Sequence, residues 1–212
     1  MQLEQIYTHI DHTVLKQTTT WAQVQKLCDE AIQGKAASVC IPPCYVAKAK
    51  EYTNGAMPIC TVIGFPNGYQ TTMVKRVETK EALANGADEI DMVINLCDVK
   101  NGEWDKVSHE IKALKHACGN RVLKVIVETC YLTEDEKVRV CQIVTEAKAD
   151  YIKTSTGFGS AGATVEDVIL FRKECGTDVK IKAAGGIRTV EDAENMLSAG
   201  ADRLGSSALL AR

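Results

Sequence analysis

Eight short apolar runs alternate with segments of helical periodicity along the whole chain. The runs are rich in Val and Ile, and several are almost continuously apolar, which is typical of parallel strands covered by helices. They cover residues 8–14, 37–42, 58–64, 88–94, 122–128, 149–153, 179–184 and 201–205. Because strands that alternate with helices pair in parallel through helical crossovers, the pattern predicts an α/β fold.

Two architectures fit this alternation. Eight strand–helix units in 212 residues predict a single (β/α)8 TIM barrel, with residues 1–212 as one domain. An open doubly wound sheet is the alternative, and it usually carries a glycine-rich loop after its first strand. No G-x-G-x-x-G sequence follows the first run, HIDHTVL. The barrel is therefore favoured.

Two local patterns support the strand–helix units. The segments ANGADEID, EAKADYIK and SAGADRLG each place Ala-Asp between the end of a helix and the start of a strand. Helix starts are predicted at Thr20, Thr164 and Thr189, each of which has a Gln or Asp three residues later. Gly34 is predicted to end the first of these helices.

Composition excludes several classes of function. The net charge is −3 and no basic run is longer than a pair, so we expect no binding to nucleic acid or membranes. No apolar stretch approaches the roughly 18 residues of a spanning helix, and MQLEQIYTHI is not a signal peptide. A cytoplasmic protein is expected. The nine cysteines are odd in number and mostly lie in apolar patterns, which favours free thiols over disulfides or a zinc site.

Charged residues occur in or beside predicted strands, where the packed interior of a barrel should exclude water. They are Glu89, Asp91, Lys124, Glu128, Lys153, Lys180 and Lys182. An unpaired buried charge is strongly destabilising, so these groups should compensate one another. A structural ion network is one interpretation. Charges on four strands of one small barrel favour an active site, because barrel enzymes place their chemistry at the C-terminal ends of the strands.

Lys153 and Lys182 end the sixth and seventh predicted strands, which are neighbours about 4.8 Å apart in a barrel. Two ammonium groups this close should lower each other's pKa. A lysine that is partly a free amine is a nucleophile toward carbonyls, and Asp91 could hold or relay a proton beside it. These residues predict a carbinolamine and Schiff-base site. Lys180 has the same strand parity as Lys182 but lies lower on the strand, so its participation stays open.

The loops after the last three strands are rich in small residues: TSTGFGSAG, AAGGIRTVED and GSS. Glycine lets backbone N–H groups approach an anion closely, and helix N-termini add positive potential. A turn is the simpler interpretation of the Gly-Gly pair alone. A phosphate site built from the last loops of a barrel is nonetheless a recurrent feature. The candidate phosphate residues are Gly185, Gly186, Arg188, Gly205, Ser206 and Ser207.

These segments also resemble a known family. IDHTVL, SVCIPP, ADEIDMVIN, LKVIVET, YIKTSTGF, KAAGGIRT and LGSS extend over nearly the whole chain. In this order and spacing they resemble the deoxyribose-phosphate aldolases, which are class I aldolases. The resemblance implies a barrel enzyme of deoxyribonucleotide catabolism that reversibly cleaves 2-deoxyribose 5-phosphate to acetaldehyde and glyceraldehyde 3-phosphate. It implies no metal and no organic cofactor, and a homo-oligomer, either a dimer or a tetramer, is expected.

The resemblance also implies roles for individual residues. Lys153 matches the Schiff-base lysine, and Lys182 matches the second lysine, which perturbs the nucleophile and helps proton transfer. Asp91 matches the aspartate of the proton relay, with Lys124 as its neighbour. The remaining substrate-site residues that the resemblance or the loop chemistry suggests are Asp11, Cys40, Thr156, Gly157, Gly185, Gly186, Arg188, Gly205, Ser206 and Ser207. Longer members of the family continue past the last loop, whereas this sequence ends at Arg212.

Three rival functions fit parts of the sequence. A metal-dependent hydrolase is suggested by His9-x-Asp11-His12, but His109 and His116 fall in the predicted helix 103–117 and should be surface residues. A pyridoxal-phosphate barrel would also use a lysine and a phosphate loop. A non-catalytic sugar-phosphate-binding barrel is the third rival, and the joint presence of both lysines and the aspartate argues against it.

Overall fold

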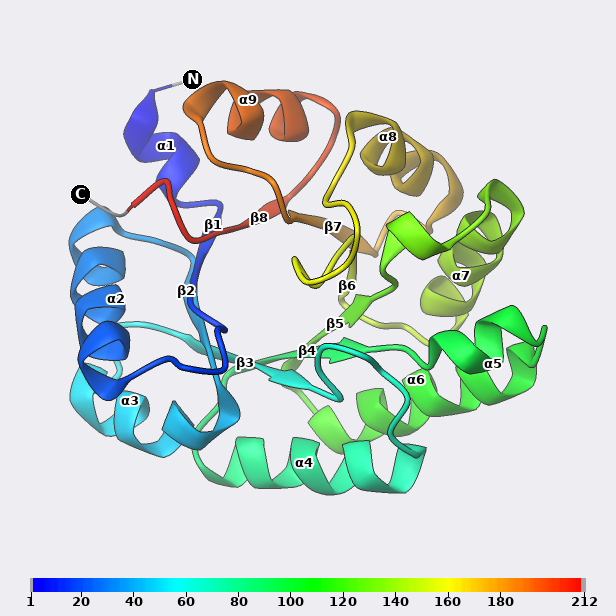
Figure 1. The fold of residues 1–212 in the computed structure, drawn as a ribbon, viewed down its shortest axis with the longest axis horizontal. Helices are drawn as coiled ribbons and strands as arrows, with labels where there is room; N and C mark the ends of the chain where they lie inside the picture. Colours follow the sequence, from blue (N-terminus) through cyan, green and yellow to red (C-terminus); the bar gives the residue numbers. More distant parts are fainter. Residues whose placement is uncertain (1, 211–212) are drawn as a thin grey trace.

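The alternating pattern folds into a closed barrel of eight parallel strands (Figure 1). The computed structural model describes residues 2–210, so Arg212 lies outside the described residues. The strands follow one another in sequence order, and β8 pairs with β1 to close the barrel. Their bounds are β1 Ile10–Thr13, β2 Ser38–Ile41, β3 Ile59–Ile63, β4 Glu89–Val93, β5 Val122–Ile126, β6 Tyr151–Lys153, β7 Lys180–Ala184 and β8 Arg203–Ser206.

The predicted strand positions are confirmed. Strands β1 to β7 lie within their predicted ranges, and β8, predicted to end at residue 205, continues to Ser206. A sheet in which each strand pairs with the next along the chain is what repeated helical crossovers produce. The predicted (β/α)8 TIM barrel is confirmed, and the open doubly wound sheet is wrong.

Helices surround the barrel (Figure 1). Their bounds are α1 Leu3–Tyr7, α2 Trp21–Gly34, α3 Val46–Thr53, α4 Thr72–Ala84, α5 Leu96–Lys100, α6 Trp104–Cys118, α7 Glu134–Glu146, α8 Val165–Glu174 and α9 Val190–Ser198. Short 3₁₀ turns, Pro43–Tyr45 and Thr129–Tyr131, follow β2 and β5. Within residues 2–210, no helix has both the length and the apolar character needed to cross a bilayer.

The predicted helix starts are confirmed. Thr20, Thr164 and Thr189 each accept a hydrogen bond from the backbone N–H three residues later. A cap of this kind stabilises a helix by about 1 kcal/mol. The end of α2 differs slightly from the prediction: Gly34 is its last helical residue, and Lys35 is the left-handed cap, with φ of 55°. A Cβ on Gly34 would overlap Leu210 Cδ2, so glycine allows close packing at this position.

The repeated Ala-Asp sequence joins neighbouring strands at their N-terminal ends. Asp88, Asp150 and Asp202 each accept, at 2.8–3.0 Å, the backbone N–H of a residue on the preceding strand. The N–H of each aspartate donates to the carbonyl of that same residue at 2.7–3.1 Å. A basic side chain also pairs with each carboxylate. The repeat therefore fixes the register of three strand pairs at the end of the barrel opposite the strand C-termini.

The two faces of the barrel strands differ in chemistry. One face of each strand packs against the helices in a continuous hydrophobic core, which includes Ile10, Val39, Ile90, Val125 and Leu204. The other face points into the lumen, because successive strand residues alternate between the two faces. The charged residues predicted from the sequence lie mostly on this inner face.

Candidate active site

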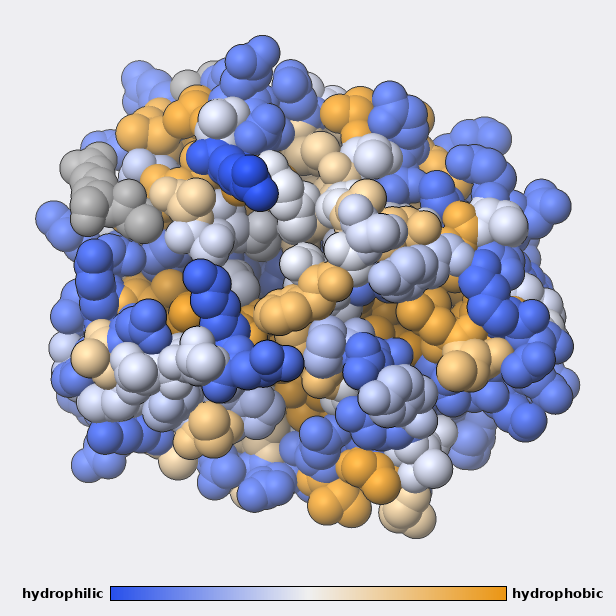
Figure 2. Space-filling view, in the orientation of Figure 1, coloured by the Kyte–Doolittle hydropathy of each residue, from blue (hydrophilic) through white to orange (hydrophobic). Residues whose placement is uncertain are grey.

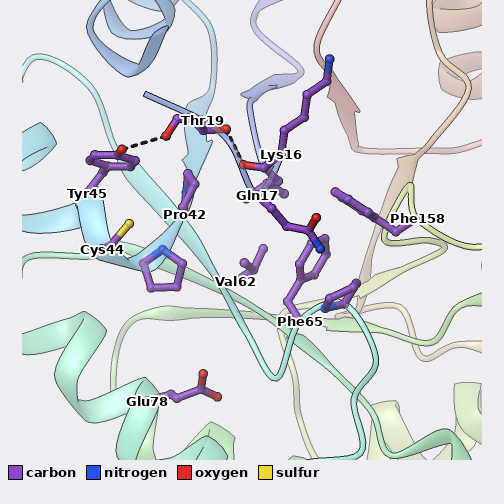
Figure 3. A pocket seen from close by; sticks show the side chains of 13 residues that line it. Lys16, Gln17, Thr19, Pro42, Cys44, Tyr45, Val62, Phe65, Glu78 and Phe158 are labelled. Carbon is purple, nitrogen blue, oxygen red and sulfur yellow. Dashed lines mark hydrogen bonds between the residues drawn. The ribbon is translucent and has the colours of Figure 1, made fainter. Parts of the chain in front are cut away.

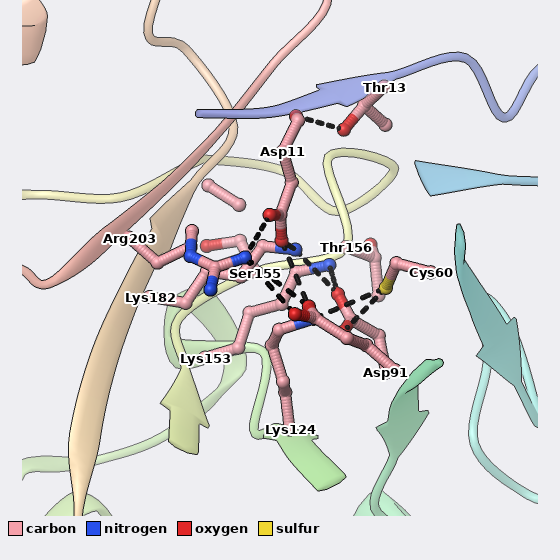
Figure 4. Close-up of polar contacts among 12 residues, drawn as sticks. Asp11, Thr13, Cys60, Asp91, Lys124, Lys153, Ser155, Thr156, Lys182 and Arg203 are labelled. Atoms are coloured by element: carbon pink, nitrogen blue, oxygen red, sulfur yellow. Dashed lines mark hydrogen bonds and ion pairs between the residues drawn. The ribbon is translucent and has the colours of Figure 1, made fainter. Parts of the chain in front are cut away.

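The charged side chains of the lumen form one cluster (Figure 4). Asp91 on β4 is the register partner of Lys124 on β5, and Lys153 on β6 is the partner of Lys182 on β7. Register partners on adjacent parallel strands point to the same face of the sheet. The predicted proximity of Lys153 and Lys182 is confirmed, and all four residues are at most 3% exposed.

Asp91 lies at the centre of this cluster. Its Oδ2 is 2.8 Å from Lys153 Nζ and 2.7 Å from Lys182 Nζ. Its Oδ1 is 2.8 Å from Lys124 Nζ and accepts a hydrogen bond from Cys60 Sγ at 3.1 Å. Burial alone would raise the pKa of Asp91, but the three ammonium groups outweigh it and hold this pKa well below its usual range. Asp91 is therefore a carboxylate at neutral pH.

Asp11 enters the same cluster from β1. Its Oδ2 accepts a hydrogen bond from Lys182 Nζ. Its Oδ1 is 2.6 Å from Arg203 Nη1 and 2.7 Å from the hydroxyl of Ser38. Burial raises the pKa of Asp11, but Lys124, Lys182 and Arg203 lower it to a greater extent, so the net shift is downward. Both lumen aspartates are thus held in the charged form.

Arg203 and Glu89 complete the cluster. Glu89 is among the strand charges predicted from the sequence, without a role of its own, whereas Arg203 was not identified. Glu89 Oε2 lies 2.5 Å from Lys124 Nζ and 3.3 Å from Arg203 Nη1. Arg203 stands two residues before Gly205 on β8, so both positions face the lumen. That strand parity is the signal that could have identified Arg203.

The charge balance of the cluster distinguishes its lysines. Within the described chain, four cationic side chains meet three carboxylates in the lumen. Lys124 and Lys182 each contact two or more carboxylates. Lys153 contacts one oxygen of Asp91, which it shares with Lys182. Lys153 is therefore the least compensated of the four cations.

The expectation that Lys182 has a lowered pKa is wrong. Burial does oppose its charge, and Lys124 repels it, but the carboxylates of Asp11 and Asp91 outweigh both effects. The pKa of Lys182 is raised above its ordinary value, so this residue is an ammonium at neutral pH. Lys180, whose role was open, is exposed and its Nζ lies 5.7 Å from the ring centroid of Tyr151, outside the cluster.

A cavity of about 370 Å³ opens at the C-terminal end of the barrel, beside Lys153. Figure 2 looks onto this end of the molecule. The predicted site residues that line the cavity are Lys153, Thr156, Gly157, Gly185, Gly186, Arg188, Gly205, Ser206 and Ser207. The predicted residues that lie beneath it, in the buried cluster, are Asp11, Cys40, Asp91, Lys124 and Lys182. Direct contact between substrate and this lower group stays a prediction.

The loops at the cavity place backbone where side chains would interfere. Gly185 and Gly186 both have φ of 83°, a left-handed conformation that favours glycine. A Cβ on Gly205 would lie 2.9 Å from Ala184 Cβ and 3.5 Å from Lys182 Cε. Glycine at the end of β8 therefore leaves room for the lysine.

The hydroxyl of Ser206 is already engaged within the protein. It donates to the carbonyl of Ile187 at 2.9 Å and accepts from the backbone N–H of Ala208 at 3.2 Å. This side chain joins the loops after β7 and β8. Its predicted role in binding phosphate stays a prediction, whereas Ser207 is exposed at the cavity.

Glu128 holds the loop after β6, a role that was not predicted. Its Oε1 accepts the backbone N–H of Thr156 at 3.1 Å, and its Oε2 accepts the hydroxyl of the same residue. The hydroxyl of Thr156 in turn accepts the backbone N–H of Phe158 at 3.0 Å. Glu128 is 2% exposed and has φ of 51°, which is uncommon for a residue other than glycine. This left-handed conformation is strained, and the buried hydrogen bonds to Thr156 hold Glu128 in it.

The histidine pattern on β1 does not form a metal site. His12 Nε2 lies 2.8 Å from Glu30 Oε2 on α2, whereas Asp11 points into the lumen. His9 Nδ1 lies 3.0 Å from the backbone carbonyl of Asp202. His9, Asp11 and His12 therefore contact three different parts of the protein. The histidines of α6 are exposed, as predicted.

The cysteines are free thiols, as predicted. Among the described residues, two groups of buried donors are close enough together to share an ion: Cys40, Cys60 and Asp91, and Asp11, Cys60 and Glu89. The carboxylates in both groups already contact lumen lysines at hydrogen-bond distance. These donors therefore serve to hold ammonium groups.

Comparisons with known proteins show the family to which the chain belongs. The chain matches the family described as DeoC/LacD family aldolase over residues 6–212. A relative from Clostridioides difficile strain 630, named deoxyribose-phosphate aldolase, is 56% identical over 98% of this chain and 94% of its own. A relative of the same name from Clostridium botulinum strain Alaska E43 is 58% identical with the same coverage.

A solved structure has the same fold. The deoxyribose phosphate aldolase from Aeropyrum pernix, described as having a unique tetrameric structure, superposes with a TM-score of 0.91 at 30% identity. It covers 99% of this chain, which in turn covers 89% of it. On the near full-length family match and the identity to curated relatives, this chain belongs to the DeoC/LacD family of aldolases.

Proposed function

We propose that this protein is a class I aldolase that reversibly cleaves 2-deoxy-D-ribose 5-phosphate to acetaldehyde and D-glyceraldehyde 3-phosphate. The names of the relatives support this substrate. The observation that carries the mechanism is the position of Lys153, whose amine lies between a buried carboxylate cluster and an open cavity. Deoxyribonucleotide catabolism is the proposed pathway, and the cytoplasm is the proposed location.

Lys153 is the proposed nucleophile. The deprotonated amine attacks the C1 aldehyde carbon of the open-chain sugar and forms a carbinolamine, and loss of water gives an iminium ion. Deprotonation of Lys153 leaves the lumen with as many cations as carboxylates, whereas deprotonation of Lys182 would oppose two carboxylates that hold its proton. The charge distribution thus favours Lys153 as the amine.

The iminium then accepts the electron pair of the C2–C3 bond. A base removes the C3 hydroxyl proton, the C2–C3 bond breaks, and C3 becomes the aldehyde of glyceraldehyde 3-phosphate. The remaining two-carbon enamine gains a proton at C2, and water hydrolyses the resulting iminium to acetaldehyde and the free lysine. Asp91 and Lys182 are the proposed relay, since they share the oxygen that also contacts Lys153.

The phosphate is proposed to bind in the outer part of the cavity. Gly185 and Gly186 have the left-handed backbone that exposes N–H groups, and Arg188 adds a positive charge at the same cavity. Thr156, held by Glu128, is placed to meet a sugar hydroxyl. This distribution supports a binding mode with the phosphate away from the buried cluster and the C1 end next to Lys153.

Trapping with borohydride tests the proposal. Acetaldehyde and borohydride together should leave an ethyl group on Lys153, seen by peptide mass spectrometry. Lys153→Ala should lose turnover of 2-deoxyribose 5-phosphate and retain its fold by circular dichroism. Lys180, an exposed lysine two residues from Lys182, is the internal control. An ethyl group found on a different lysine, or no label at all, would contradict the assignment.

A homo-oligomer is proposed as well. The Aeropyrum pernix relative is tetrameric, and this chain exposes apolar side chains at and just before α4: Tyr69, Met73, Val74 and Val77. Figure 2 shows apolar surface over α4 at the lower edge of the view. Size-exclusion chromatography with light scattering measures the assembly, and a single-chain mass of 23.1 kDa would contradict it.

A further inference from the structure

The charged residues that line the cavity beside Lys153 are all cationic among residues 2–210. They are Lys16, Lys153 and Arg188, and none of the described carboxylates lines the cavity. Lys153 belongs to the buried cluster, so Lys16 and Arg188 are the charges of its outer part. The sequence pattern identified Arg188 but not Lys16, which lies beyond β1 and far from the glycine-rich loops along the chain.

The backbone of Lys16 is held firmly. Its carbonyl accepts the backbone N–H of Thr19 at 3.0 Å and the hydroxyl of the same residue at 2.7 Å. The carbonyl of Thr19 accepts the hydroxyl of Tyr45 at 2.8 Å (Figure 3). Two of these three hydrogen bonds are side-chain bonds that no regular element requires. The turn after β1 is therefore built to present residue 16 at a fixed place.

The side chain of Lys16 is uncommitted by contrast. Within residues 2–210 its ammonium has no hydrogen bond and no ion pair, and the residue is exposed. Figure 3 shows the side chain of Lys16 extended, with its Nζ directed away from Phe65 and Glu78. Arg188 likewise makes no side-chain ion pair within 4 Å in the described chain, although its charge acts on the nearby Asp192. Two cations without an ion pair of this kind therefore share one cavity.

We propose that Lys16 binds the substrate phosphate and sets the preference of the enzyme for phosphorylated over unphosphorylated deoxy sugars. This inference rests on the proposed function. A phosphate monoester carries about −1.5 to −2 charges at pH 7, more than Arg188 alone compensates. Lysine supplies a mobile point charge that reaches such an anion without a fixed geometry. The turn after β1 thus closes the phosphate site on the side that the glycine-rich loops leave open.

Steady-state kinetics with two substrates test the proposal. Lys16→Met keeps the apolar stem and removes the charge, and Lys16→Arg restores a cation. The ratio of kcat/KM for 2-deoxyribose 5-phosphate to that for 2-deoxyribose should fall about tenfold in Lys16→Met, the effect of one charge-assisted hydrogen bond. The fall should lie mainly in KM, and Lys16→Arg should recover most of the ratio. Lys112→Met, on the exposed side of α6, is the matched control.

Binding of inorganic phosphate separates this inference from the proposed function. Phosphate raises the melting temperature of a protein that binds it in the folded state, and the measurement needs no catalysis. The rise should be smaller for Lys16→Met than for wild type and Lys112→Met. An unchanged ratio, or an equal phosphate-induced rise in all variants, would overturn the role of Lys16. A wild-type protein that binds phosphate through Lys16 and cleaves neither sugar would overturn the proposed function instead.

Discussion

Replacement of Asp91 by Asn tests the buried cluster most directly. The carboxylate contacts three ammonium groups and is fully buried. Asn has no charge, and its amide oxygen cannot accept from all three. The variant would leave four cations facing the carboxylates of Asp11 and Glu89 alone. Removal of one partner from a buried ion pair costs about 3–5 kcal/mol, a large part of the roughly 5–15 kcal/mol that stabilises a typical protein.

The pH dependence of this loss has a definite sign. The folded state lowers the pKa of Asp91, so its stabilisation is present above about pH 4 and disappears as the pH falls. The folded state raises the pKa of Lys124 and Lys182, so their stabilisation is present below about pH 10 and disappears as the pH rises. In Asp91→Asn the lysines repel one another, and deprotonation relieves that repulsion. The deficit should therefore be smaller at pH 10 than at pH 7.

Urea unfolding measures both effects. Wild type, Asp91→Asn and the control Asp178→Asn are compared at pH 7 and pH 10 by circular dichroism. Asp178 is exposed and has no hydrogen bond or ion pair in the described chain, so its variant should stay within about 0.5 kcal/mol of wild type. We expect Asp91→Asn to lose about 4 kcal/mol at pH 7. A loss below about 1 kcal/mol, or a deficit that grows toward pH 10, would refute the reasoning.

Three further variants test separate parts of the site. Glu128→Ala should lose about 1–3 kcal/mol of unfolding free energy, because the buried N–H of Thr156 loses its acceptor, and its KM should rise. Glu128→Gln should recover part of the unfolding free energy, measured by urea unfolding, and part of the KM, measured by steady-state kinetics. Equal losses in the two variants would contradict the contact with Thr156. Gly205→Ala should destabilise by about 1–3 kcal/mol, measured by urea unfolding, since its Cβ would lie 2.9 Å from Ala184 Cβ; a neutral result would contradict the close packing. Lys182→Leu should slow Schiff-base formation at neutral pH and move its pH profile upward, because the ammonium that shares Asp91 Oδ2 with Lys153 is lost; rapid-mixing measurements that give the wild-type profile would exclude this effect.

Local patterns in the sequence carried much of the fold and part of the site. The length and apolar character of the strand segments, their alternation with helices and the capping residues such as Thr20 predicted the barrel. Strand parity and the order of parallel strands then placed Lys153 beside Lys182. These relations were accessible because side-chain direction along a strand and pairing with the next strand follow from local geometry.

Only the tertiary structure decided the electrostatics. Arg203 and Glu89 meet across the lumen from β8 and β4, and Glu128 reaches Thr156 from the end of β5, which are contacts that no local pattern predicts. The pKa of Lys182 moved in the direction opposite to the expectation, because Asp11, distant along the chain, raises this pKa together with Asp91. A pKa depends on the sum of burial and all nearby charges, each weighted by distance. Those distances arise only when the barrel closes and brings β1 against β8.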